Sequence, residues 1–327
     1  MPSLIIEMAV PRKLIADELN TFEKKFADAV KSTNPSLDRI MKYIIKRKGK
    51  QIRPMFVFLS AKLHGEINDS TYRAAALVEL LHTATLVHDD VVDESFERRG
   101  FFSINALWKN KIAVLVGDYL LSKGLLLSTG HNEFKQLHIL SEAVQQMSEG
   151  ELLQLEKARK MNIREDIYFQ IIKSKTASLL ASACAAGAWS TSQNEEITGK
   201  MKLFGEKMGI AFQIKDDLFD YGFENVGKPT GNDIKEKKFT LPLIYTLNNV
   251  TPAERRRIIY IIKNQGQESD KRKWVLDLVT TSGGIRYASE KMQKYKKEAL
   301  DILFEFPKSE IRDGLQELVE YTIERKY

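Results

Sequence analysis

The sequence predicts an all-α fold, and three observations support this prediction. Several long segments carry apolar residues at the three- and four-residue spacing of an amphipathic helix. Glycine and proline, which interrupt helices, are scarce, with 18 and 8 copies in 327 residues. Alternating apolar and polar residues, the pattern of a half-buried strand, are weak throughout. We therefore expect helices joined by short connections, in one domain over residues 1–327, because no linker or change of composition divides the chain.

Three segments show the helical pattern most clearly. One apolar stripe runs from Leu77 to Val91, and another runs from Met201 to Phe212. Between them, the alanine-rich segment from Ala177 to Trp189 predicts a buried helix, in which the only cysteine, Cys184, is a packed residue and not a nucleophile. Breaks between helices are predicted near residues 49–54, 65–70, 99–103, 129–133, 161–165, 190–195, 222–233 and 266–270. Asp69 or Ser70, at the second of these breaks, is expected to cap the helix that follows.

Composition narrows the functional classes. A single cysteine excludes an internal disulfide framework and predicts a reducing compartment, the cytoplasm. The N-terminal residues lack the pattern of a signal peptide, and no stretch is expected to reach the roughly 18 apolar residues of a membrane span. The net charge of +6 fits anionic ligands, but nucleic acid, phospholipid and small diphosphates all stay open on charge alone.

Two acidic motifs with the pattern DDxxD carry the strongest chemical signal. They are Asp89–Asp93 and Asp216–Asp220, and each follows an apolar run that predicts a helix. Residues four apart share a helix face, so the outer carboxylates of each motif point the same way. Clusters of carboxylate oxygens suit Mg²⁺, which often completes its shell with substrate phosphates. The two motifs therefore predict chemistry on a diphosphate.

The first motif extends a polar ridge along its helix. At about 100° per residue, Asp89 and Asp93 each point within about 20° of the direction of His82, one on either side of it. Such a ridge could be a transition-metal site, a Mg²⁺-diphosphate site or a solvated helix face. The second acidic motif, also at the end of an apolar helix, favours a functional site, because aspartate is a poor helix former.

Basic and polar residues accompany both acidic motifs. Six Lys and Arg residues and no acid lie between Lys42 and Arg53, and Arg98 and Arg99 follow the first motif. An exposed basic helix end or a nucleic-acid patch would also explain these charges, although aromatic residues for base stacking are sparse there. Around the second motif stand Gln213, a glycine-rich segment over residues 227–233 and the segment 238–242, and the pair at 175–176 opens the alanine-rich helix.

Taken in order, these motifs resemble those of the trans-prenyltransferases, also called isoprenyl diphosphate synthases or polyprenyl synthetases. The resemblance covers about Gly49 to Pro242, and Gln51 departs from it, since the family more often has arginine there. It implies a single polyprenyl synthetase domain with an isoprenoid-synthase-type helical bundle around a deep central cavity. The matching motifs are GKQIRP, His82, DDVVD, RRG, GELLQ, KT, FQIKDD, GKPTGND and KFTLP.

The resemblance also implies site residues for a magnesium-dependent condensation of isopentenyl diphosphate with an allylic diphosphate. About three Mg²⁺ ions per active site would be held by Asp89, Asp93 and Asp216, with Asp90, Asp217 and Asp220 completing the acidic shells. The allylic diphosphate would bind Arg98, Lys175, Lys228 and, more weakly, Lys238. Isopentenyl diphosphate would bind Lys50, Arg53, His82 and Arg99, and Thr176 and Gln213 would stabilise the allylic cation. Thus the catalytic set is Asp89, Asp93, Asp216, Lys175, Thr176 and Gln213.

Small residues before the first motif predict a long product. In the family, the positions five and four before the first aspartate help to set chain length, and here they are Ala84 and Thr85. Leu140, Val144 and Met147 are candidates for a deeper floor, although all five could be ordinary core residues. We expect an all-trans product from heptaprenyl to decaprenyl, with octaprenyl as the central prediction, for quinone side chains.

Other expectations and rivals follow from the same resemblance. The family suggests a homodimer without a nucleic-acid partner or transmembrane segment, with peripheral membrane contact for product release, and Arg325 and Lys326 are read as a solvated tail. A short-chain farnesyl or geranylgeranyl diphosphate synthase, a terpene cyclase, a squalene-type synthase and a regulatory subunit of a heteromeric synthase are the rival readings. A basic nucleic-acid-binding protein is the remaining non-enzyme reading.

Overall fold

The computed structural model describes residues 9–46, 49–98, 100–161, 164–222 and 230–324, and these residues are mainly helical. The only sheet in this part of the chain is an antiparallel hairpin of two-residue strands. The all-α prediction is therefore confirmed. The elements are α1 (Ala9–Lys13), α2 (Ala16–Ala29), α3 (Pro35–Ile45), α4 (Ile52–Lys62), α5 (Asp69–Val92), β1 (Glu97–Arg98), β2 (Phe101–Phe102), α6 (Ile104–Thr129), α7 (Phe134–Lys160), α8 (Glu165–Ile172), the π-helix η1 (Lys173–Ala177), α9 (Ser178–Ser192), α10 (Glu195–Phe219), α11 (Asn232–Lys235), α12 (Leu241–Asn249), α13 (Pro252–Tyr260), the π-helix η2 (Ile261–Gln265), α14 (Ser269–Thr281), α15 (Gly284–Leu303) and α16 (Glu310–Glu324).

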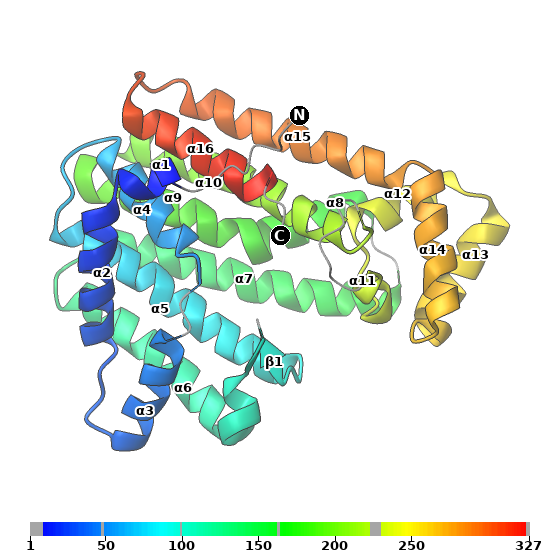
Figure 1. Ribbon diagram of the computed structural model, residues 1–327, viewed down its shortest axis with the longest axis horizontal. Coiled ribbons are helices and arrows are strands. Elements are labelled where there is room, and N and C mark those ends of the chain that lie inside the picture. The colour runs from blue at the N-terminus through cyan, green and yellow to red at the C-terminus, as the bar shows by residue number, and fades with distance from the viewer. Residues whose placement is uncertain (1–8, 47–48, 99, 162–163, 223–229, 325–327) are drawn as a thin grey trace.

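The long helices lie side by side around α9 (Figure 1). α9 packs against α4, α5, α7 and α10, and α10 packs in turn against α15. Small residues permit this close approach, since a Cβ atom on Gly187 would lie 2.3 Å from the carbonyl oxygen of Val57. The prediction of a buried alanine-rich helix is therefore confirmed. Cys184 is fully buried there, and burial raises its pKa to about 12, which agrees with a packed residue.

α5 lies between two hydrophobic clusters, and this position fixes its rotation. Leu77 and Leu81 belong to the main core with α9 and α10. Leu80, Ala84 and Val87 belong to a smaller core that includes residues of α3 and α6. Because apolar side chains hold α5 on two sides, the polar residues of its last turns have a fixed direction.

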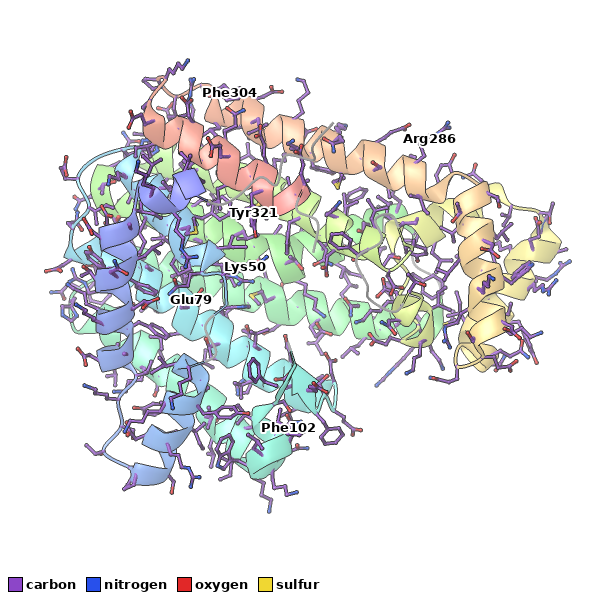
Figure 2. The ribbon with its side chains drawn as sticks, in the orientation of Figure 1. Lys50, Glu79, Phe102, Arg286, Phe304 and Tyr321 are labelled. Atoms are coloured by element: carbon purple, nitrogen blue, oxygen red, sulfur yellow. The ribbon has the colours of Figure 1, made fainter. Side chains whose placement is uncertain are left out.

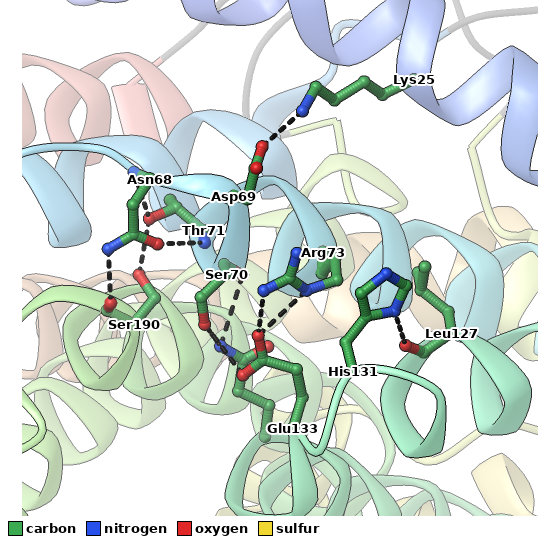
Figure 3. A network of polar contacts seen from close by, with 11 residues as sticks. Lys25, Asn68, Asp69, Ser70, Thr71, Arg73, Leu127, His131, Glu133 and Ser190 are labelled. Carbon is green, nitrogen blue, oxygen red and sulfur yellow. Dashed lines mark hydrogen bonds and ion pairs between the residues drawn. The ribbon is translucent and has the colours of Figure 1, made fainter.

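The N-terminal end of α5 is anchored by a polar network (Figure 3). We expected Asp69 or Ser70 to cap this helix, and that prediction is wrong by one residue. Asn68 is the N-cap, since its side chain accepts from the backbone N–H of Thr71 and the Thr71 side chain returns a bond to the Asn68 backbone. Asp69 instead pairs with Lys25 at 2.6 Å. The opposite end of α5 carries the first acidic motif.

The predicted breaks all fall at or between helix ends, because glycine and polar residues gather there. One apolar segment is longer than we expected, however. α6 is long and apolar enough to cross a membrane by length and composition alone, over a window of 18 residues. Only 33% of that window is buried, and one such helix is weak evidence for a membrane span.

Candidate active site

Two pockets lie around the C-terminal end of α5. The first has a volume of about 740 Å³, and we call it the basic pocket after the predicted diphosphate ligands Lys50, Arg53 and His82 that line it. Its lining also includes Arg12, the acids Glu23, Glu79 and Asp90, and apolar side chains. The second, the acidic pocket, has a volume of about 690 Å³. It is lined by the predicted site residues Asp93, Lys175, Thr176, Gln213, Asp216, Asp217, Asp220 and Lys238. Most of the predicted site residues that the structure describes therefore line one of these two pockets.

The predicted polar ridge on α5 extends from one pocket to the other. His82 lines the basic pocket and Asp93 lines the acidic pocket. Asp93 is the C-cap of the helix and is exposed, whereas Asp89 is half-buried. Asp90 is only 4% exposed, and its backbone carbonyl accepts from the Asn105 side chain at 3.0 Å. The three carboxylates of the first acidic motif therefore differ in exposure, and Asp93 is the exposed one.

Lys50 lies at the rim of the basic pocket beside the C-terminal helix. Its ammonium group donates to the hydroxyl of Tyr321 at 2.9 Å, and both residues are labelled in Figure 2. Gln51, the residue that departs from the family pattern, has a left-handed backbone conformation with φ of 55° and donates to Glu23 at 3.2 Å. The departure therefore leaves Lys50 and Arg53 lining the same pocket.

The second acidic motif lies at the C-terminal end of α10, and its three carboxylates differ in surroundings. Asp216 is exposed, and Asp217 is buried. Asp220 accepts the backbone N–H groups of Asn232 and Asp233 at 2.8 and 2.9 Å, so it holds the start of α11 against α10. Of the three, Asp216 is the carboxylate that solvent and ligands reach most directly.

A chain of hydrogen bonds links Asp217 to the centre of the acidic pocket. Asp217 accepts from the hydroxyl of Tyr168 at 2.6 Å and from the amide nitrogen of Gln213 at 2.8 Å. The amide oxygen of Gln213 accepts from the hydroxyl of Thr176 at 2.7 Å. Burial raises the pKa of Asp217 to about 7, and the two hydrogen bonds from Tyr168 and Gln213 oppose this shift.

Lys175 belongs to a π-helical turn on the wall of the acidic pocket. π-helical turns are rare and frequently lie at functional sites. The turn η1 packs against α7 at Gly150, where a Cβ atom would lie 2.8 Å from the side chain of Ser174. The ammonium group of Lys175 forms an ion pair with Glu151 on α7. Gly150 therefore allows the close approach that brings Glu151 to Lys175.

Asp233 and Lys238 complete the charge pattern of the acidic pocket. Burial, together with the carboxylates of Asp217 and Asp220, raises the pKa of Asp233 to about 8. Burial opposes the charge of Lys238, but Glu236, Asp233 and Asp93 outweigh burial and raise its pKa. Lys238 thus interacts with carboxylates of both acidic motifs, because it also lowers the pKa of Asp217.

Sequence reasoning missed three residues of this pocket. Glu151 and Asp233 belong to the motifs GELLQ and GKPTGND, which the sequence analysis identified. No function was predicted for either residue. Tyr168 stands in no motif, and only the packing of α8 against α10 brings its hydroxyl to Asp217. No sequence signal would have found Tyr168.

The donor set fits magnesium shared with a ligand. Within the described ranges, no three His, Cys, Asp or Glu side chains are arranged to hold an ion by themselves. The exposed carboxylates of Asp93 and Asp216 line one pocket, together with the lysines that would bind phosphate. Mg²⁺ prefers oxygen ligands and commonly combines one or two carboxylates with substrate phosphates. These residues therefore suit an ion that is bound together with a diphosphate.

Several predicted residues lie elsewhere. Arg99, Lys228, Arg325 and Lys326 fall outside the described residues, as does the side chain of Arg98. Asp89 and the five predicted chain-length residues line neither of the two pockets. Ala84 is fully buried in the smaller core, Thr85 donates to the carbonyl of His82 at 2.9 Å, and Leu140, Val144 and Met147 pack in or against the main core. Their roles stay predictions.

Comparison with known proteins identifies the family. The polyprenyl synthetase family model matches residues 34–279. The chain is 34% identical to the octaprenyl diphosphate synthase of Escherichia coli (strain K12) over 96% of this chain and 97% of that protein. It is also similar to the crystal structure of a decaprenyl diphosphate synthase from Rhodobacter capsulatus, with a TM-score of 0.93, 33% identity and coverage of 98% and 100%. A polyprenyl synthase from Caulobacter crescentus CB15, complexed with calcium and isoprenyl diphosphate, has a TM-score of 0.90, 32% identity and full coverage of both chains.

Proposed function

This chain belongs to the polyprenyl synthetase family and is a prenyltransferase, and we propose that it adds isopentenyl diphosphate units successively to an allylic diphosphate. The product is a long all-trans polyprenyl diphosphate, from heptaprenyl to decaprenyl with octaprenyl as the central expectation, for quinone side chains. Long-chain synthases among its relatives support this reading over a short-chain enzyme. A regulatory subunit is not favoured, since both acidic motifs are intact.

The single observation that carries the proposal is the placing of two charged pockets at one end of α5. The basic pocket offers Lys50, Arg53 and His82 to the diphosphate of isopentenyl diphosphate. The acidic pocket offers carboxylates for Mg²⁺, with Lys175 and Lys238 for the allylic diphosphate. Because the acidic motif on α5 contributes to both pockets, the two substrates would meet beside it. Arg98, Arg99 and Lys228 are proposed as further diphosphate ligands.

The chemistry requires charge stabilisation and not a protein nucleophile. Heterolysis of the allylic C–O bond leaves its electron pair on the diphosphate and forms an allylic cation. Mg²⁺, when bound, supplies positive charge to the leaving diphosphate. Asp89, Asp93 and Asp216 are proposed to hold about three such ions together with the substrate. Lys175 stabilises the same developing charge, and the oxygens of Thr176 and Gln213 stabilise the cation. The double bond of isopentenyl diphosphate then attacks, and a proton leaves to the diphosphate.

The test is an assay of the purified chain with farnesyl diphosphate, isopentenyl diphosphate and Mg²⁺. We expect products from heptaprenyl to decaprenyl diphosphate, identified by mass, and no product after chelation of Mg²⁺. Products no longer than geranylgeranyl diphosphate would contradict the long-chain proposal. Absence of any prenyl transfer, together with salt-dependent DNA binding, would contradict the reaction itself.

Product length is proposed to depend on the helix that carries the first motif. We predict that Ala84→Phe shortens the product, as measured by mass. Ala84 is fully buried in a closed cluster, so the larger side chain should also destabilise the fold by about 1–3 kcal/mol. Thr85→Phe is the companion variant, because Thr85 is only half-buried. Unchanged product length in both variants would remove these positions from the tunnel floor.

We also propose a homodimer that acts in the cytoplasm. α6 and α7 expose large apolar side chains that the described fold does not cover, including Leu115 at 62%, Leu126 at 67% and Leu152 at 68%. Exposed apolar faces of this kind mark interaction surfaces. We predict that Leu115→Asp with Leu126→Asp yields a monomer by light scattering. Phe304→Asp, a change at an exposed apolar residue just after α15, should leave the dimer intact. Brief membrane contact would serve release of the long product.

A further inference from the structure

We propose that Tyr168 is a positioning residue, which acts through Asp217 and Gln213 to fix the direction of the Thr176 hydroxyl. The four side chains come from α8, α10 and η1 and form one continuous hydrogen-bonded series. The inference rests on the proposed prenyl transfer, since it assigns to Thr176 an oriented oxygen beside the allylic cation. Tyr168 lies outside every motif that the sequence contains.

The direction of each hydrogen bond follows from the chemistry of Asp217. One carboxylate oxygen of Asp217, Oδ1, accepts from the amide nitrogen of Gln213 at 2.8 Å, and the other, Oδ2, accepts from the hydroxyl of Tyr168. The amide oxygen of Gln213 is therefore turned the other way, toward Thr176. The single hydroxyl proton of Thr176 is then committed to Gln213, and the Thr176 oxygen has only lone pairs left for the acidic pocket that it lines.

The local backbone supports this assignment for Thr176. Ser and Thr hydroxyls within helices commonly donate to the carbonyl four residues earlier. The nearby Ser178 does so, with a bond of 2.6 Å to the carbonyl of Ser174. Thr176, in the π-helical turn, instead donates across to α10. The hydroxyl of Thr176 therefore has a long-range partner where its neighbour has a local one.

Tyr168 keeps Asp217 in the required orientation. Its side chain is 3% exposed, and its hydroxyl occupies one carboxylate oxygen of Asp217 while Gln213 occupies the other. Without the tyrosine hydroxyl, one oxygen of a buried carboxylate would lose its donor, and Asp217 and Gln213 could rearrange. A rearranged amide that turned its nitrogen to Thr176 would force the hydroxyl proton into the pocket. A proton directed at a forming cation is unfavourable, whereas lone pairs are favourable.

The first measurement is the steady-state rate of Tyr168→Phe with farnesyl diphosphate and isopentenyl diphosphate. We expect kcat to fall about 10-fold, while both KM values stay within about twofold, because the Tyr168 hydroxyl donates to Asp217 and acts on the cation only through the series. Tyr221→Phe is the matched control. Tyr221 is also buried, and its hydroxyl bonds to Thr240 at 2.6 Å, outside the series. Its kcat should stay within about twofold of wild type.

The decisive measurement is a double-mutant cycle with Thr176→Val. If Tyr168 acts through the Thr176 hydroxyl, Tyr168→Phe should change kcat by less than about twofold in the Thr176→Val background. In the Thr176→Ser background, which restores a hydroxyl, its effect should return to about 10-fold. The proposal would be overturned if the effects of Tyr168→Phe and Thr176→Val on kcat simply multiplied in the double variant. A Tyr168→Phe defect confined to KM would also overturn it.

Folding and the proposed reaction are controlled separately. Thermal unfolding establishes that each variant is folded, and if Tyr168→Phe is not, Gln213→Met breaks the same series one step closer to Thr176. Gln213→Met should then lose part of its effect in the Thr176→Val background and keep only what the Gln213 oxygen contributes directly to the cation. An undiminished effect there would overturn the series. Failure of the wild-type chain to form prenyl products would refute the proposed function. A working wild type with no coupling between Tyr168 and Thr176 would refute only this inference.

Discussion

The two DDxxD motifs have the same sequence pattern but different structural roles. The first ends α5, where Asp93 is exposed at the helix cap and Asp90 is nearly fully buried beside the basic pocket. The second ends α10, where Asp216 is exposed and Asp217 is buried in a hydrogen-bonded series. The shared spacing predicts a common helix face, but the neighbouring elements decide which carboxylates a ligand reaches.

The last aspartates of the two motifs differ most. Asp93 stays exposed in the acidic pocket, whereas both carboxylate oxygens of Asp220 accept backbone N–H groups at the start of α11. A carboxylate held in this way acts as a cap for the following segment. The comparison suggests that an acidic motif can combine a ligand-binding residue with residues that maintain the wall around it.

The largest expected effect concerns the exposed members of the two motifs. We predict that Asp93→Asn and Asp216→Asn each lower kcat by about 10²–10³-fold, because each removes a charge that would hold Mg²⁺ at the leaving diphosphate. Steady-state assays at saturating Mg²⁺ provide the measurement. Asp69→Asn is the control, since Asp69 is an exposed acid at the opposite end of α5. Near-normal activity of Asp216→Asn would break the functional equivalence of the two exposed aspartates.

A second prediction concerns the buried member of the second motif. The pKa of Asp217 is about 7 in the folded protein and 3.8 in the unfolded chain. Between these two pH values, the folded state therefore binds more protons than the unfolded state. The stability that Asp217 contributes is therefore full below about pH 4 and is lost as the pH rises through about 7, by up to roughly 4 kcal/mol. Asp233, with a pKa of about 8, acts in the same direction.

Urea unfolding of metal-free protein between pH 4 and 8 measures this contribution. Asp217→Asn should reduce the loss of stability with rising pH, leaving the share of Asp233. Asp93→Asn, a change at an exposed position, is the matched control and should keep the wild-type slope. If the two variants showed equal slopes, burial would not distinguish the motifs.

The smallest expected effect concerns Asp220. We predict that Asp220→Asn destabilises the fold by about 0.5–2 kcal/mol, because the amide keeps one acceptor oxygen of the cap and loses the other. Its kcat should fall less than that of Asp216→Asn, by under about 10-fold. Unfolding and steady-state assays on the same samples give both values. A stable Asp220 variant as inactive as Asp216→Asn would instead identify Asp220 as a metal ligand.

Much of the fold could be predicted because its signals are local. Helical spacing, scarce glycine and proline, and alanine-rich composition depend on a few neighbouring residues, and the helices formed accordingly. Local signals also misled in two places. The cap of α5 was displaced to Asn68, because a reciprocal bond with Thr71 is available there. The apolar character of α6 was overlooked, because Asp118 and Lys123 interrupt its sequence.

The sequence by itself determined the helices, the two acidic motifs and the family, since each depends on residue type and order along the chain. Only the tertiary structure decided which aspartates are exposed, that Asp220 caps α11, and that Tyr168 contacts Asp217 across 49 positions of sequence. Burial and hydrogen bonding are set by neighbours that packing brings from distant segments. The aspartates of two motifs with the same pattern therefore differ in exposure and hydrogen bonding, because different helices surround them.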